Sequence, residues 1–223
     1  MRTTTSIAGA ALGALLWCFT ADAGATAAPA PASVAAPPTA TATSAIAGSA
    51  AAQPVKRLQA ALIVCMRDGK RLGYQGRYRH LDKVVRGAFD FPFISRVVMG
   101  TDWAKLDASQ QKQLQDALAK LSVSSYAKEF HSYSGERFVA DGTRQLGGAE
   151  LVRFIFHSGH DRIHFDYQMH RDAAGQWKIA NVIVDGVSDL ALKSGQYRAL
   201  FVKQGYGALI AWIDKQIATN GGT

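Results

Sequence analysis

Four of the six histidines stand close together in the sequence, and their side chains are the first candidates for chemistry. They are His157, His160, His164 and His170. Imidazole serves as a zinc ligand and as a general base, so the cluster raises the hypothesis of a metal-dependent hydrolase. The spacing contains no H-E-x-x-H or H-x-H pattern and no supporting carboxylate. His164 and His170 alternate with apolar residues, which favours solvated histidines on the polar side of a strand. We therefore predict no enzyme, no metal and no cofactor, and keep a hydrolase using the His157–His170 region as an alternative.

The candidate nucleophiles give no stronger signal than the histidines. Ser158 lies between His157 and His160 but lacks the G-x-S-x-G pattern that exposes a catalytic serine. Cys65 shares a helical stripe with Leu58 and Leu62, which favours a buried apolar role over catalysis.

The chain divides into three segments of different composition. Residues 1–25 carry Arg2 and then an apolar run from Ile7 to Phe19, followed by small residues, as in a cleavable signal peptide. Residues 26–54 are rich in alanine and proline and contain no charged residue, which predicts a disordered linker. Residues 55–223 are long enough for one folded domain. Export argues against a nucleic-acid partner despite the formal net charge of +8, so we predict none.

The hydrophobic period changes once along the folded domain. Apolar residues recur every three or four positions from Val55 to Met66 and again after Asp107, which predicts helices. Alternation then predicts strands from about Phe138 to Val184, with glycine-bearing turns typical of hairpins. Helical spacing returns after Gly186. We predict an α+β fold with a curved antiparallel sheet of about four strands under helices.

Large apolar side chains are in excess on the predicted sheet. Such residues either fill a core or line an apolar cavity of the kind that binds small molecules. Residue types do not separate these cases, so a non-catalytic interaction module with a filled core remains a second alternative. The candidate residues are Phe154, Phe156, Ile163, Phe165, Tyr167, Trp177 and Ile179.

Five segments, taken in order, are similar to those of a known family. They are residues 89–103 (FDFPFISRVVMGTDW), 110–114 (QQKQL), 125–130 (SYAKEF), 165–169 (FDYQM) and 175–188 (GQWKIANVIVDGVS). The chain resembles the MlaC, or toluene-tolerance, family of periplasmic lipid carriers over residues of about 55–217. Residues 60–70 and 133–138 resemble its hopanoid-biosynthesis-associated HpnM branch.

The resemblance implies a function and a set of partners. It implies an apolar cavity between sheet and helices that takes a phospholipid or a hopanoid, with shuttling between the inner and outer membranes. An inner-membrane lipid transporter and an outer-membrane lipoprotein complex would be the partners, and the periplasm the location. By position, Phe165, Tyr167 and Met169 would face inward from one strand, and Trp177 and Ile179 from the next.

The positive charge is concentrated in the first predicted helical hairpin. Between Val55 and Arg86 there are nine basic residues against two aspartates. Such a patch is either a solvated helical face or a surface that docks on anionic head groups or on an acidic partner, with binding that weakens in salt. The basic residues are Lys56, Arg57, Arg67, Lys70, Arg71, Arg77, Arg79, Lys83 and Arg86.

Overall fold

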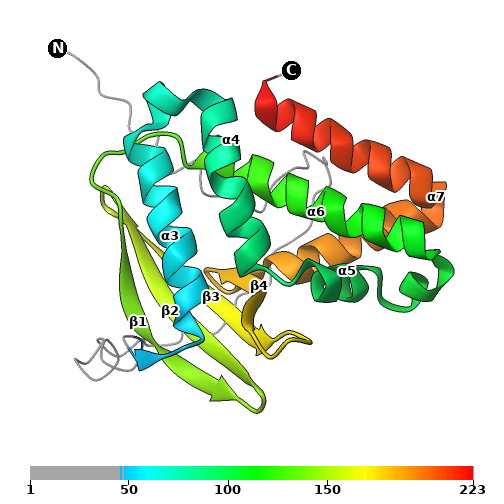
Figure 1. Ribbon diagram of the computed structural model, residues 1–223, viewed down its shortest axis with the longest axis horizontal. Coiled ribbons are helices and arrows are strands. Elements are labelled where there is room, and N and C mark those ends of the chain that lie inside the picture. The colour runs from blue at the N-terminus through cyan, green and yellow to red at the C-terminus, as the bar shows by residue number, and fades with distance from the viewer. Residues whose placement is uncertain (1–45, 47, 223) are drawn as a thin grey trace, which may run out of the picture.

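The computed structural model describes residue 46 and residues 48–222 (Figure 1). The expected signal peptide and most of the expected linker lie outside these residues. The helices are α3 (Ala52–Arg67), α4 (Gly69–Ala88), α5 (Phe91–Met99), the 3-10 helix η2 (Gly100–Lys105), α6 (Ala108–Glu129) and α7 (Asp189–Gly221). The strands are β1 (Arg137–Leu146), β2 (Ala149–Ser158), β3 (Asp161–Arg171), β4 (Trp177–Val184) and β5 (Val187–Ser188). No helix in this part of the chain combines the length and apolarity needed to cross a bilayer.

The helix ends follow from local side-chain hydrogen bonds. The Asp90 carboxylate accepts a bond from the Phe93 backbone N–H at the start of α5, at 2.9 Å. Asp107 and Gln110 form a reciprocal capping box at the start of α6. Each cap satisfies backbone donors that have no partner within the helix, so these sequence signals determine where the helices begin.

The folded unit begins earlier than residue 55. Helix α3 starts at Ala52, and Ile46, Ala51 and Ala52 are fully or almost fully buried. The prediction of a disordered linker up to residue 54 is therefore wrong at its end. The methyl groups of Ala51 and Ala52 pack closely in the core. The alanine-rich composition of this segment did not indicate which residues they would pack against.

The five strands form one antiparallel sheet in the order β1-β2-β3-β4-β5. The α+β class is confirmed, and the sheet has a fifth strand beyond the four or so expected, because Val187 and Ser188 pair with the end of β4. In the register of β2 and β3, Phe154 lies opposite Phe165 and Val152 opposite Tyr167. One face of these strands thus carries a continuous layer of large apolar side chains.

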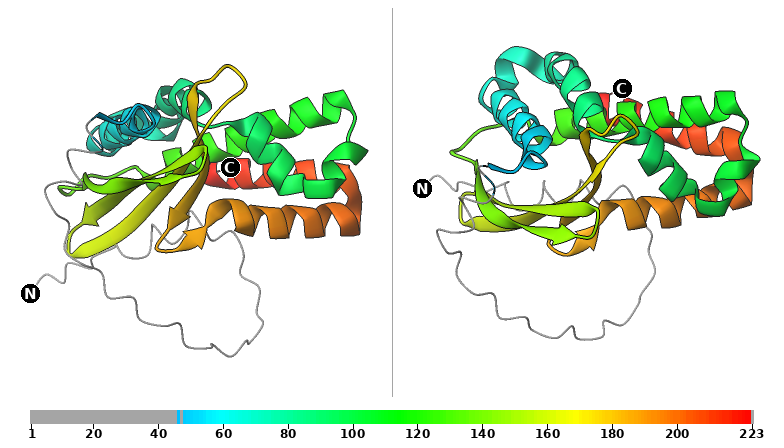
Figure 2. Two further views of the ribbon diagram at one scale, coloured as in Figure 1. Left: turned by 90° about the horizontal axis from the view of Figure 1, so that it is seen from below. Right: turned by 60° about the horizontal axis from the view of Figure 1, so that its bottom comes forward.

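The helices cover this apolar face and extend beyond one end of the sheet (Figure 2). Helices α3 and α4 form a hairpin over the sheet, and α6 packs against α4 and α7. Helix α7 reverses direction at Gly205, whose backbone is non-helical with a φ of 83° and a ψ of 176°. Its first arm (residues 189–204) leaves the sheet, and its second arm (residues 206–221) returns (Figure 1). The first arm contacts α5 and η2, and the reversal brings the second arm against α6.

Candidate functional site

An apolar cavity of about 80 Å³ lies where β3 and β4 meet α6 and both arms of α7. Its buried end is formed by aromatic and branched side chains, among them Phe165, Tyr126 and Val184. The full lining is Phe89, Leu121, Ser122, Ser125, Tyr126, Phe165, Val182, Val184, Asp189, Leu192, Lys193, Gln196, Tyr197, Trp212 and Gln216. An apolar enclosure with a few polar groups is the usual form of a small-molecule site.

Two further hollows adjoin this cavity along the first arm of α7. A hollow of about 20 Å³ lies towards α5 and shares Phe89 and Val182 with the cavity. Another of about 260 Å³ lies between the two arms of α7 and shares Tyr197 and Trp212 with it. The first arm of α7 therefore forms one wall of all three.

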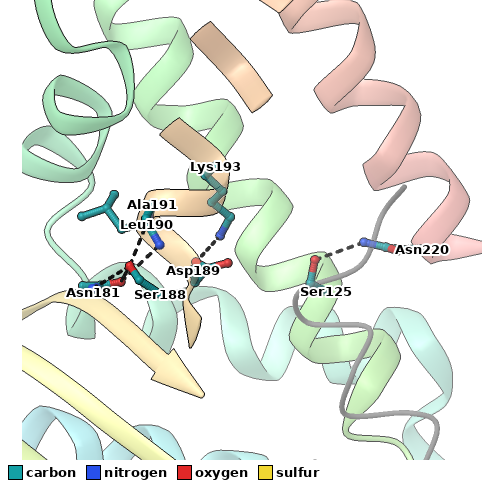
Figure 3. Close-up of polar contacts among 8 residues, drawn as sticks. All are labelled: Ser125, Asn181, Ser188, Asp189, Leu190, Ala191, Lys193 and Asn220. Atoms are coloured by element: carbon teal, nitrogen blue, oxygen red, sulfur yellow. Dashed lines mark hydrogen bonds and ion pairs between the residues drawn. The ribbon is translucent and has the colours of Figure 1, made fainter. Parts of the chain in front are cut away.

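The start of α7 is held to the sheet by a small polar network (Figure 3). The Asn181 side-chain oxygen accepts a hydrogen bond from the Leu190 backbone N–H at 3.1 Å, and its amide donates to the Ser188 hydroxyl oxygen at 3.0 Å. The Ser188 oxygen in turn accepts from the Ala191 N–H at 3.1 Å, as the N-cap of α7. Strand β4 thereby sets the direction in which α7 leaves the sheet.

Two charged side chains lie in the cavity wall. The Lys193 ammonium and the Asp189 carboxylate are 2.6 Å apart, one helical turn from each other on α7 (Figure 3). Their side chains are 25% and 28% exposed, whereas Phe165 is 2% exposed. The charges therefore lie at the more open end of the cavity. Burial raises the pKa of Tyr126, in the same cavity wall, well above its usual value, with smaller contributions from Tyr167 and from the nearby Asp189, so its hydroxyl is neutral.

The eight residues predicted to bind a ligand do not gather around one cavity. Phe165 lines it, and Phe154 lines a separate open groove between α3 and β1. The side chains at the centre of the sheet are 0–2% exposed and fill the core; they are Phe156, Tyr167, Met169 and Ile179. Ile163 and Trp177 are half-buried, and Trp177 lies under the Arg171 guanidinium at 4.6 Å.

The remaining lining comes mostly from α6 and α7, which the strand periodicity did not single out. Leu121, Tyr126, Tyr197 and Trp212 read as ordinary apolar positions of amphipathic helices. Only the reversal at Gly205 brings the second arm of α7 to the cavity, so no spacing in the sequence marks these residues as a set.

The basic hairpin is exposed over most of its predicted residues, with one clear exception. Arg77 is 8% exposed, and its guanidinium donates to the Ala127 carbonyl oxygen at 2.7 Å and to the Gly69 carbonyl oxygen at 2.8 Å. It ties α4 to α6 and to its own first turn, and is not available for docking. Arg86 is half-buried and pairs with Asp82 and Asp116. Lys56 is half-buried and donates to the Ile46 carbonyl oxygen at 3.1 Å. The exposed members are Arg57, Arg67, Lys70, Arg71, Arg79 and Lys83.

The histidines do not form a metal-binding cluster. Within residues 46 and 48–222 there is no group of three or more His, Cys, Asp or Glu side chains close enough to hold a metal ion. His164 is exposed, as expected. His170 is not simply solvated: its Nε2 lies 3.0 Å from an Asp90 carboxylate oxygen, and its ring lies 4.4 Å from that of Phe93. Burial raises the pKa of the Cys65 thiol to about 11, as befits a core side chain.

Comparisons with known proteins agree with this arrangement. Residues 56–215 match the family described as MlaC protein. A solved phospholipid-binding protein from Ralstonia solanacearum, in complex with a phospholipid, superposes with a TM-score of 0.66 at 19% sequence identity. The alignment covers 80% of this chain and 98% of that one. A comparison with curated proteins finds no match.

Proposed function

This chain belongs to the MlaC family, and from that premise we propose that it is a periplasmic carrier that moves a phospholipid between the inner and outer membranes. The family consists of lipid-binding proteins that are not enzymes. The observation that carries the proposal is the apolar cavity between the sheet, α6 and the folded-back α7. Its two charged side chains are partly exposed, whereas Phe165 is buried, which matches an amphiphilic ligand.

The energetics require a carrier of this kind to enclose its ligand. Removing an acyl chain of about 16 methylenes from water is worth ~0.8 kcal/mol per CH₂, or on the order of 13 kcal/mol. A cavity that shields the chain supplies this free energy without any catalytic group. It must also release the chain at the target membrane, so its walls have to move.

The first arm of α7 is the wall that we expect to move. A volume of about 80 Å³ is far below that of a phospholipid, so the cavity has to enlarge when the lipid enters. The arm lies between Gly186 and Gly205, both with a φ of 83°. Its side-chain links to the body include the Ser194 hydroxyl donating to the Val98 carbonyl oxygen at 3.1 Å and Arg198 at 3.5 Å from Asp102. Outward movement of the arm beyond its first turn, which Asn181 holds to β4, would break these contacts and widen the cavity.

The ligand class follows from the relatives and from the resemblance. The Ralstonia protein was solved with a phospholipid, and this supports a phospholipid here. The similarity of residues 60–70 and 133–138 to the HpnM branch supports a hopanoid as the competing ligand. Both are amphiphiles with a large apolar part, so the identity of the extracted lipid decides between them.

Location and partners complete the proposal. The expected signal peptide at residues 1–25 would deliver the chain to the periplasm, between an inner-membrane transporter and an outer-membrane lipoprotein complex. The exposed basic residues of the α3–α4 hairpin would dock on anionic lipid or on an acidic partner surface. Reversing the charge of Arg57, Arg71 and Arg79 should weaken binding to anionic vesicles, as should high salt. Matched reversals of the exposed Arg96, Lys112 and Lys203, outside the hairpin, should not.

The test is to identify what the protein carries out of cells. Protein purified without detergent is analysed by native mass spectrometry, and its extracted lipid by chromatography with mass detection. A carrier shows one lipid molecule per chain, and the extracted species identifies a phospholipid or a hopanoid. Empty protein in repeated gentle preparations overturns the proposal and favours an interaction module with a filled core.

A further inference from the structure

The charged groups of the cavity wall form a matched pair. Of the residues that line the cavity and the hollow next to it, Asp189 and Lys193 carry charge, and both residues line both spaces. The net charge presented to a ligand is therefore zero, with one positive and one negative group a helical turn apart. The other polar lining residues, such as Ser122 and Gln196, are neutral.

The position of the pair matches that of a lipid head group. Both side chains are about one-quarter exposed, between the buried aromatic end of the cavity and solvent. An acyl chain lying against Phe165 and Tyr126 would leave its polar end near the first turns of α7. Figure 3 shows the ion pair on these turns, with Ser125 of α6 also in view.

Charge complementarity then distinguishes between head groups. A head group with a phosphate and an ammonium can exchange partners with the pair, placing phosphate against Lys193 and ammonium against Asp189, so no charge is left unpaired. An anionic head group satisfies Lys193 but brings a second negative charge beside the Asp189 carboxylate, and like charges close together are unfavourable. An uncharged polyol can hydrogen-bond to the pair but cannot replace either charge.

We propose that Asp189 and Lys193 form a head-group site that selects zwitterionic phospholipids over anionic ones. This inference rests on the proposed lipid-carrying function and adds the head-group class to it. The alternative role for this ion pair is purely structural, as an i,i+4 contact that stabilises the first turns of α7.

The experiment measures selectivity within one sample. Full-length protein is delipidated and incubated with vesicles of equal phosphatidylethanolamine and phosphatidylglycerol, and the bound species are counted by native mass spectrometry. The wild-type protein should carry an excess of phosphatidylethanolamine. In Asp189→Asn that ratio should fall by about fivefold, as expected for a partly exposed charge contact. Asp214→Asn, at an exposed position on the second arm of α7, is the matched control and should keep the wild-type ratio.

A second variant separates head-group recognition from helix stability. The double substitution Asp189→Lys with Lys193→Asp keeps both charges in the cavity wall but reverses their order, so it should recover most of the preference lost in Asp189→Asn. A wild-type ratio equal to that of the vesicles, or an Asp189→Asn ratio unchanged at full occupancy, overturns this inference and leaves the carrier intact. Failure of every variant and of the wild type to take up either lipid overturns the proposed function instead.

Discussion

Filling the cavity from its α6 wall should weaken lipid binding while leaving the fold in place. Ser122 is half-buried and lines both the main cavity and the hollow beside it. Replacing it with phenylalanine puts an aromatic ring where an acyl chain would lie. Serine and phenylalanine have similar helix propensities, so α6 itself should tolerate the change.

The size of the effect follows from the volume of the cavity. A space of about 80 Å³ holds roughly three methylene groups, if each takes up about as much room as a water molecule at ~30 Å³. Excluding three methylenes at ~0.8 kcal/mol each costs about 2.4 kcal/mol, or roughly a fiftyfold increase in Kd. The same ring fills an existing space, so the loss of stability should stay below the ~1–3 kcal/mol typical of overpacking.

The assay is displacement of a fluorescent phospholipid, with thermal unfolding followed by circular dichroism on the same samples. Ser122→Phe should raise Kd roughly fiftyfold and lower Tm by only a few degrees. Ser132→Phe, at an exposed position in the segment between α6 and β1, serves as the control and should bind like the wild type. If Ser122→Phe is folded and binds with unchanged affinity, the acyl chain does not lie in this cavity.

Three further expectations concern the core that supports the site. Arg77→Ala should lower the free energy of unfolding, measured in denaturant, by about 3 kcal/mol, because two buried charge-assisted hydrogen bonds are lost. Replacement of the exposed Arg79 by alanine should change that free energy by no more than about 0.5 kcal/mol. Equal effects of the two substitutions would refute a structural role for Arg77. Cys65 should resist iodoacetamide at pH 8 in native protein and react in denaturant, as read by peptide mapping. Because its pKa rises from 9.0 to about 11 on folding, its contribution to stability should also fall as pH rises through that range. Gly69→Ala should lower Tm, because the added methyl group would overlap the His131 carbonyl oxygen; an unchanged Tm would mean that this segment shifts freely.

The local features of the fold could be predicted from the sequence because their causes are local. Asp90 and Asp107 cap helices through bonds to residues three positions away, and that spacing is visible in the chain. In β3 the buried residues Phe165, Tyr167 and Met169 alternate with more exposed ones, so the expectation that they face inward holds. In β2 the alternation is less informative, because Leu151 and Ile155 on the opposite face are buried as well. Cys65 was recognised as a core residue by its helical stripe.

The exposure of the basic residues could not be predicted in the same way. Arg77 has the same residue type and helical setting as Arg79, but only Arg77 faces α6, where the Ala127 carbonyl oxygen accepts its hydrogen bond. Whether an arginine side chain is exposed to solvent or forms buried hydrogen bonds depends on which helix packs beside it.

By itself, the sequence determined the class of the fold, the run of helices and strands, and a family of lipid-binding proteins. The tertiary structure alone decided which apolar residues enclose space and which fill it. Tyr167 and Met169 are residue types that could line a cavity, but their side chains are fully buried in the core against the sheet. Trp212, in contrast, lines the cavity because α7 turns back at Gly205. Hydrophobic burial has no direction, so the pattern of apolar residues specifies a core, and only the packing of distant elements determines where that core is left hollow.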